Sequence, residues 1–206
     1  MKTALQLTSQ VARHYGFYLA GGMGLATILR HRMSEALDFF INAPFDAACI
    51  AAELRDLDLS GRQGATSAST LYWYTEGDEA QKASFIAAQG RSSLVHEAAL
   101  MDRTASVASL RDIAAMKSIA IIGRIEKKDY IDMAAILSIG RLSLGDILAF
   151  NAIKYAGSAY SEDTLVRSLV YFVDVDPLPL PIMTSPLTWN EAKRVITAAV
   201  RAMGTS

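Results

Sequence analysis

Cysteine is nearly absent from this sequence: Cys49 is the single one among 206 residues. One cysteine excludes an intrachain disulfide and any zinc site built from cysteines. We expect Cys49 to be a small buried apolar residue. The three histidines, His14, His31 and His96, lack the spacing of metal ligands, so a zinc site of another kind is not expected either.

Charge of either sign is not in excess, because 20 basic residues face 21 acidic ones and the net charge is −1. No global basic field attracts nucleic acid, although a local groove could still bind it. Long hydrophobic runs are missing as well. The most apolar stretch, residues 17–29, contains three glycines and is shorter than the roughly 20 residues of a membrane-spanning helix.

The amino-terminal residues 1–16 lack the continuous apolar region of a signal peptide. What the sequence does have is a hydrophobic content of 51%, which is typical of a globular chain that buries a sizeable core. We therefore expect a cytoplasmic protein that has no membrane as a partner.

Hydrophobic patterning predicts an α/β first half. The expected helices are residues 3–15, Leu25 to about His31, and 44–57 with Pro44 in its first turn. The expected strands are residues 17–20, 36–41, a hairpin that begins with 70–75, and a short strand before Ser109. "GGMG" at 21–24 is expected to be a turn and 58–69 a loop.

The second half is predicted to be helical. The expected helices are residues 109–124, 127–140, 142–157, 161–173 and 188–203, and a proline-rich extended segment, 174–183, precedes the last of them. The sequence thus predicts two domains: an α/β core at 1–108 and a helical domain at 109–206. The fold class is α+β.

Strand, Gly-Gly, helix, and then a strand that carries an acid is a layout that can handle phosphate. Gly21 and Gly22 allow close backbone approach, and the following helix offers free N–H groups to an anion. Asp38 could ligate a metal beside the phosphates. A simple tight turn and a strand-end acid bonded to backbone N–H groups explain the same residues, so both interpretations stay open.

The stretch "FYLAGGMGLATILRHRMSEALDFF" resembles the opening motif of AbiEii/AbiGii-toxin-type nucleotidyltransferases, Gly-Gly-Thr/Ser, His-Arg-x-Ser and Asp-x-Asp-Phe-Phe. "SLRDIAAMKSIAIIGRIEKKDYIDMAAIL" and "LVYFVDVDPLPLPIMTSPLTWNEAKRVI" resemble its later blocks. The three matches occur in order from about residue 17 to residue 200. The resemblance implies a nucleotidyltransferase-like mixed sheet flanked by helices and followed by a carboxy-terminal helical bundle.

The resemblance also implies roles for the residues that match. The implied catalytic residues are Asp38, Asp129 and Asp132, with Asp38 as the ligand of Mg²⁺. The implied nucleotide-binding residues are Gly21, Gly22, Ser34, Lys117 and Lys128. Members of this family transfer a nucleotide from a nucleoside triphosphate to an RNA or protein acceptor, and a separate antitoxin is the expected protein partner.

Two positions depart from the family pattern. Met23 replaces the hydroxyl residue after Gly-Gly, and Ala36 replaces the first acid of the metal-binding pair. Glu35 is adjacent, but on a strand it points to the opposite face. Ser84 stands where a third acid would be sought. Because carboxylates must fix the ions in two-metal nucleotidyl transfer, we expect impaired catalysis.

The second half admits two interpretations. Lys117 and Arg124 share an otherwise apolar helical stripe, so each needs a carboxylate or a ligand phosphate as partner, or reaches solvent with its head group. Asp129 and Asp132 fit a functional role. They fit a structural role equally well, with Asp129 as a first-turn acid and Asp132 in a surface pair with Lys128. The function hypotheses are accordingly an impaired nucleotidyltransferase, or a non-catalytic pseudoenzyme that binds nucleotide or protein.

Overall fold

The computed structural model describes residues 4–57, 61–75, 82–88, 96–98, 105–157 and 161–204. The chain forms two compact units. The strand unit comprises Met1–Gly24 and Ser34–Ser109, and the helical unit comprises Leu25–Met33 and Leu110–Ser206. Residues 25–33 therefore belong with the helical unit, although they lie far from it in the sequence.

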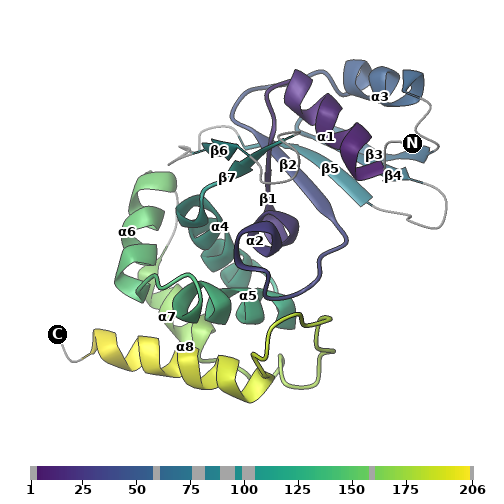
Figure 1. The fold of residues 1–206 in the computed structure, drawn as a ribbon. Coiled ribbons are helices and arrows are strands. Elements are labelled where there is room, and N and C mark those ends of the chain that lie inside the picture. Colours follow the sequence, from purple (N-terminus) through teal and green to yellow (C-terminus); the bar gives the residue numbers. More distant parts are fainter. Residues whose placement is uncertain are drawn as a thin grey trace. The chain divides into compact units, whose positions relative to one another are not determined.

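The strand unit is built on a seven-stranded mixed sheet in the order β3-β4-β5-β2-β1-β7-β6 (Figure 1). Its strands are β1 (Tyr18–Ala20), β2 (Leu37–Ile41), β3 (Gly61–Ser67), β4 (Thr70–Thr75), β5 (Lys82–Ala87), β6 (His96–Ala98) and β7 (Ser106–Ala108). The pairs β1–β7 and β2–β5 are parallel and the others antiparallel. This arrangement confirms the predicted mixed sheet.

Two helices, α1 (Ala4–His14) and α3 (Ala47–Asp56), pack against each other in this unit. Aromatic rings form part of the core. Phe39 on β2 and Phe85 on β5 lie on one sheet face, with ring centroids 5.4 Å apart. Phe17 meets Phe85 edge-on at 5.3 Å. Alternation along β4 buries Trp73 and leaves its tyrosine neighbours half-buried.

Three local expectations in this unit are wrong. Helix α2 (Gly21–Leu29) begins at Gly21 itself, so "GGMG" is its first turn rather than a preceding turn. Helix α3 begins after Asp46, whose carboxylate accepts from the N–H of Ala48 at 2.8 Å, and not at Pro44. The expected loop at 58–69 contains strand β3.

Cys49 is exposed, contrary to the expectation of burial. Helix α3 turns Ile50, Ala51 and Leu54 toward the core and leaves Cys49 on the outer side of its first turn. The Cys49 thiol lies 3.4 Å from the Asp46 carboxylate, to which it donates. That hydrogen bond raises the pKa of the Cys49 thiol.

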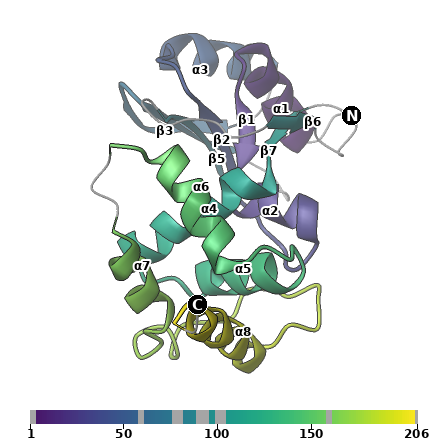
Figure 2. The same cartoon turned by 90° about the vertical axis from the view of Figure 1, so that its left-hand side faces the viewer.

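The helical unit consists of α4 (Leu110–Gly123), α5 (Lys127–Ser138), α6 (Leu144–Lys154), α7 (Glu162–Leu169) and α8 (Trp189–Met203), which confirms the predicted helical second half. Helix α5 is buried on all sides from Asp129 to Ile136 and packs against α4 and α8 (Figure 2). A helix buried all round forms the centre of its bundle. In the part of the chain that the structure describes, no helix is long and apolar enough to cross a membrane.

Candidate functional site

The first candidate site lies where β1 runs into α2. The antiparallel register pairs Ala20 with Asp38, which brings the next residue, Gly21, against the Asp38 side chain. A Cβ atom on Gly21 would lie 2.7 Å from Asp38 Oδ2, a distance that a real side chain cannot occupy. Gly21 also has a φ of +61°, in the left-handed region. Both constraints require glycine at this position.

Gly21 and Gly22 form the first turn of α2, where backbone N–H groups have no intrahelical acceptor. The helix dipole adds partial positive charge at the same end. This first turn can therefore accept an anion beside the Asp38 carboxylate. Met23 follows in the same turn and supplies no hydroxyl.

Asp38 is half-buried and, among the described residues, no ion pair involves its carboxylate. Its neighbours on the sheet lack acids. Ser84, which is buried, lies opposite Asp38 in the parallel register of β2 and β5. Ala36 directly precedes β2, and Glu35 before it is exposed. Ser84 thus lies beside Asp38, where the family pattern would place a third acid.

The donor set around Asp38 does not fit two metal ions. In the described part of the chain, no three His, Cys, Asp or Glu side chains gather as a metal site. One carboxylate and the Ser84 hydroxyl fall short of the several carboxylates that a two-metal centre needs. A Mg²⁺ ion that arrives with nucleotide phosphates needs only one or two protein carboxylates, of which Asp38 would supply one.

Ser34 lies in the loop before β2, is half-buried, and belongs to the strand unit. The other sequence-predicted residues, Lys117, Lys128, Asp129 and Asp132, belong to the helical unit. Lys128 is exposed on α5, and its ammonium lies 3.6 Å from Glu126. A surface pair of Lys128 with Asp132, which was one of the two open interpretations, does not form because Asp132 is buried.

Asp132 is the centre of a buried cluster of charges. Arg32 binds it with two parallel hydrogen bonds, Nε to Oδ1 at 2.6 Å and Nη2 to Oδ2 at 2.8 Å. Such a bidentate fork is the strongest geometry for an arginine–carboxylate pair. The Nζ atom of Lys117 lies 2.5 Å from Oδ2. Both oxygens of the Asp132 carboxylate thus face donors from Arg32 or Lys117.

His31 completes the shell around Asp132, with Nε2 at 2.7 Å from Oδ1. Since a carboxylate can only accept, Nε2 carries the proton and donates it. The other ring nitrogen, Nδ1, is buried and has no hydrogen-bond partner within the described ranges. The backbone carbonyl of His31 accepts from Ser185 Oγ at 3.0 Å, which ties residues 30–32 to the segment before α8.

Asp129 extends the cluster by one helical turn. The Lys117 ammonium bridges the two aspartates, because it also lies 2.8 Å from Asp129 Oδ1. Arg124 adds a second fork, with Nε 2.7 Å from Oδ2 and Nη2 3.1 Å from Oδ1. Lys117 therefore has protein carboxylates as partners, which is one of the three alternatives that its sequence position left open.

Burial and neighbouring charges act in opposite directions on these groups. Burial alone would raise the pKa of Asp132, but the Lys117 charge and the hydrogen bonds from His31 and Arg32 hold it well below its usual range. Burial also opposes ionisation of Asp129, and Lys117 and Arg124 together keep its pKa lowered. The pKa of Lys117 is raised, since the two aspartates outweigh its burial.

Residue-by-residue reasoning missed His31, Arg32 and Arg124 as partners of these aspartates. A signal was present for two of them, because His31 and Arg32 lie in the His-Arg-x-Ser stretch that carries the resemblance. A second buried pair was not expected at all: Lys154 on α6 lies 2.7 Å from Asp112 on α4. Its sequence signal is weak, since the two residues are 42 positions apart.

Comparison with solved structures supports the architecture. The crystal structure of JHP933 from Helicobacter pylori is similar with a TM-score of 0.62 and 14% identity, and the match covers 100% of this chain and 93% of that one. A structure described as a "putative nucleotidyltransferase" from H. pylori matches with a TM-score of 0.61 and 13% identity over 98% and 92% of the two chains. The chain has a nucleotidyltransferase fold.

No family model matches the sequence. A search of curated proteins finds the uncharacterized protein aq_aa25 of Aquifex aeolicus (strain VF5), which is 33% identical over 161 residues. The match covers 77% of this chain and 74% of that protein. At this identity and coverage, the chain belongs to the same protein family as aq_aa25 of Aquifex aeolicus.

Proposed function

We propose that this chain binds a nucleoside triphosphate at the junction of β1 and α2, and that its nucleotidyl transfer to an RNA or protein acceptor is impaired. The observation that carries the proposal is the Asp38 carboxylate, which forms no ion pair with any residue that the structure describes and lies beside Gly21 at the first turn of a helix. Nucleotidyltransferase-fold neighbours favour a nucleotide over other anions.

At this junction the backbone N–H groups and the Asp38 carboxylate would bind different parts of the ligand. The N–H groups of Gly21 and Gly22 would hold phosphate oxygens. Asp38 would repel a bare phosphate, so it is suited to a phosphate that carries Mg²⁺, for which it supplies an oxygen ligand. Ser34, in the loop that leads to β2, is proposed to contact the nucleotide.

Impairment is proposed because two expected carboxylates are missing. Ala36 and Ser84 flank the position of Asp38 in the chain and in the sheet register, and neither is an acid. Their absence removes negative charge that would fix the position of the ions and of the attacking hydroxyl. Glu35 is exposed in the loop before β2, so it could replace the missing acid at Ala36 only if that loop turned its side chain toward Asp38.

The helical unit is proposed to contribute structure more than chemistry. Asp129 and Asp132 are buried and engaged by cations, so a general-base role would first have to break several strong ion pairs. Lys117 is likewise engaged by both aspartates. Lys128 is exposed, and we retain it as a candidate for a nucleotide contact.

The assignment to the AbiEii toxin type, with an antitoxin as partner, rests on the three sequence motifs and remains part of this proposal. The second candidate function is a non-catalytic module that keeps the fold for binding. The missing acids at Ala36 and Ser84 favour it.

The test measures nucleotide transfer and nucleotide binding separately. Native protein, Ala36→Asp and Ala36→Asn are incubated with Mg²⁺, each α-labelled nucleoside triphosphate and total cellular RNA, and label in RNA and in protein is counted. We expect Ala36→Asp to exceed native protein by about 100-fold or more, as large as the loss of one key electrostatic contact in other enzymes. Ala36→Asn matches the shape without the charge and should stay at the native level.

Equilibrium binding of labelled nucleoside triphosphate gives the second readout, with Asp38→Asn as the variant expected to bind less tightly in the presence of Mg²⁺. Transfer by native protein at the level of Ala36→Asp would contradict impairment. Absence of nucleotide binding by both native protein and Ala36→Asp would contradict the nucleotide site as a whole.

A further inference from the structure

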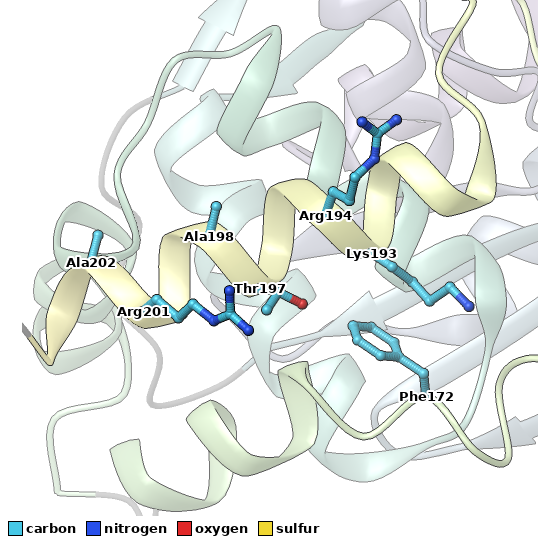
Figure 3. A pocket seen from close by; sticks show the side chains of 7 residues that line it. All are labelled: Phe172, Lys193, Arg194, Thr197, Ala198, Arg201 and Ala202. Carbon is cyan, nitrogen blue, oxygen red and sulfur yellow. The ribbon is translucent and has the colours of Figure 1, made fainter.

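A groove of about 650 Å³ runs along the outer side of α8 in the helical unit (Figure 3). Its lining residues are Phe172, Lys193, Arg194, Thr197, Ala198, Arg201 and Ala202. Lys193, Thr197 and Arg201 recur every fourth residue, at steps of about 6 Å along the helix, and project from one side of α8. The small side chains of Ala198 and Ala202 leave the neighbouring ridge low.

The basic groups of this groove differ in how strongly they are neutralised. Lys193 is paired with Asp176 at 2.8 Å. Arg194 is 3.9 Å from Glu191, with a side chain that is 76% exposed, so that pair is weak. In the part of the chain that the structure describes, no salt bridge involves Arg201. Two guanidinium groups therefore remain available to an acidic partner.

Phe172, which lines this groove, is the third of four consecutive apolar residues, Val170–Val173. Val173 is 70% exposed, Tyr171 48% and Val170 41%, and Phe172 lines the groove itself. Single exposed apolar residues are ordinary, but three exposed apolar side chains within four residues, with the half-buried Phe172 among them, are typical of an interaction surface. Aliphatic and aromatic side chains next to arginines are the composition of protein interfaces.

The aromatic geometry separates a protein partner from nucleic acid. Single-stranded nucleic acid needs open aromatic faces on which bases stack. The Phe172 ring packs edge-on against Trp189 at 5.8 Å and Tyr130 at 6.0 Å, and Lys193 lies over it at 5.9 Å. Its faces are thus already in use. The hydroxyl of the exposed Tyr171 donates to the Asp174 carboxylate at 3.1 Å, and that negative charge would repel a phosphate backbone.

We propose that this groove is a docking site for an acidic protein segment. The segment would place an aliphatic side chain against Val170, Phe172 and Val173, and carboxylates against Arg194 and Arg201. Charge complementarity is the reason for proposing an acidic partner, since the two arginines lack strong acidic partners in the described chain. The proposal does not depend on nucleotide binding by the strand unit.

A displayed library of random peptides is the probe, selected against the full-length native protein. We expect the enriched peptides to combine Asp or Glu with an aliphatic residue. Their affinity, measured by fluorescence anisotropy, should fall about tenfold with Arg201→Glu and with Val173→Asp, which is the loss expected for one central interface contact. Arg55→Glu on α3 and Ile153→Asp on α6 are the matched controls, both at exposed positions, and should change affinity less than about twofold.

Three outcomes would overturn the proposal. No enrichment of acidic peptides, or equal losses with Arg55→Glu and Arg201→Glu, would show that the groove has no specific acidic partner. Binding of a labelled single-stranded RNA oligonucleotide that Arg201→Glu abolishes would assign the surface to nucleic acid. Concentration-dependent dimers in analytical ultracentrifugation that Val173→Asp dissociates would identify the occupant as a second copy of this chain.

Discussion

Asp132 and Asp38 occupy opposite electrostatic environments at the scale of single residues. Asp132 has no exposed surface and contacts His31, Arg32 and Lys117. Asp38 is half-buried and, in the described ranges, unpaired. A buried charge whose partner is removed costs far more than a surface pair is worth. This contrast makes the Asp132 cluster a determinant of stability and leaves Asp38 available to a ligand.

We therefore predict that Lys117→Met lowers the free energy of unfolding by about 3–5 kcal/mol, because two buried carboxylates lose the cation they share. Urea denaturation, followed by circular dichroism, measures the change. Lys128→Met removes a lysine from the same helix that carries both aspartates, but at an exposed position. Its effect should stay within about 0.5 kcal/mol. A Lys117→Met protein as stable as the native one would refute a structural role of the cluster.

The burial of Asp129 and Asp132 could not be derived from their spacing. Residues three apart share a helix face whether that face meets solvent or protein. The two aspartates are buried because α4 and α8 pack against α5. The apolar residues that follow Asp132, from Met133 to Ile136, were the local hint that this helix lies inside.

At the scale of elements, the start of α8 has a complete capping box. Glu191 N donates to Thr188 Oγ1 at 3.3 Å, and the Glu191 carboxylate accepts from Thr188 N at 2.8 Å. We predict that Thr188→Ala costs about 1 kcal/mol of stability, since one helix-end donor loses its acceptor. Thermal and urea unfolding measure this loss. Asn190→Ala, an exposed change in the same turn, serves as the control, and an equal cost in both variants would argue against the cap.

The elements predicted correctly from the sequence are those with a strong apolar periodicity or with residues that clearly start or end an element. The five helices of the helical unit and strands β1, β2, β4 and β7 follow from their apolar patterns. Strand β3 does not, because Gly61, Gly64 and its polar residues have low strand propensity and β4 pairs with it at the edge of the sheet. Strand β6, also at an edge, has only three residues.

At the scale of the whole molecule, the aspartate cluster predicts the response to acid. The folded-state pKa values of Asp129 and Asp132 lie below the unfolded value of 3.8. Their stabilising contribution is therefore complete above that value and is lost as the pH falls toward the folded-state pKa. We expect the unfolding free energy to drop steeply below about pH 4, as the two carboxylates become protonated.

Urea titrations at a series of pH values measure this slope. Asp132→Asn should flatten it, since the variant has one fewer carboxylate to protonate, although its stability near neutral pH is lower. Glu35→Gln removes an exposed carboxylate and should leave the slope at that of the native protein. An unchanged slope in Asp132→Asn would contradict the ion-pair assignment.

The placement of residues 25–33 in the helical unit also sets an order of events during synthesis. His31 and Arg32 leave the ribosome 101 and 100 residues before Asp132, their shared partner. At the usual rate of translation this separation is a wait of roughly 5–20 s. Throughout that interval the two side chains stay hydrated, and the bundle cannot close over its aspartates until both distant parts of the polypeptide have been made.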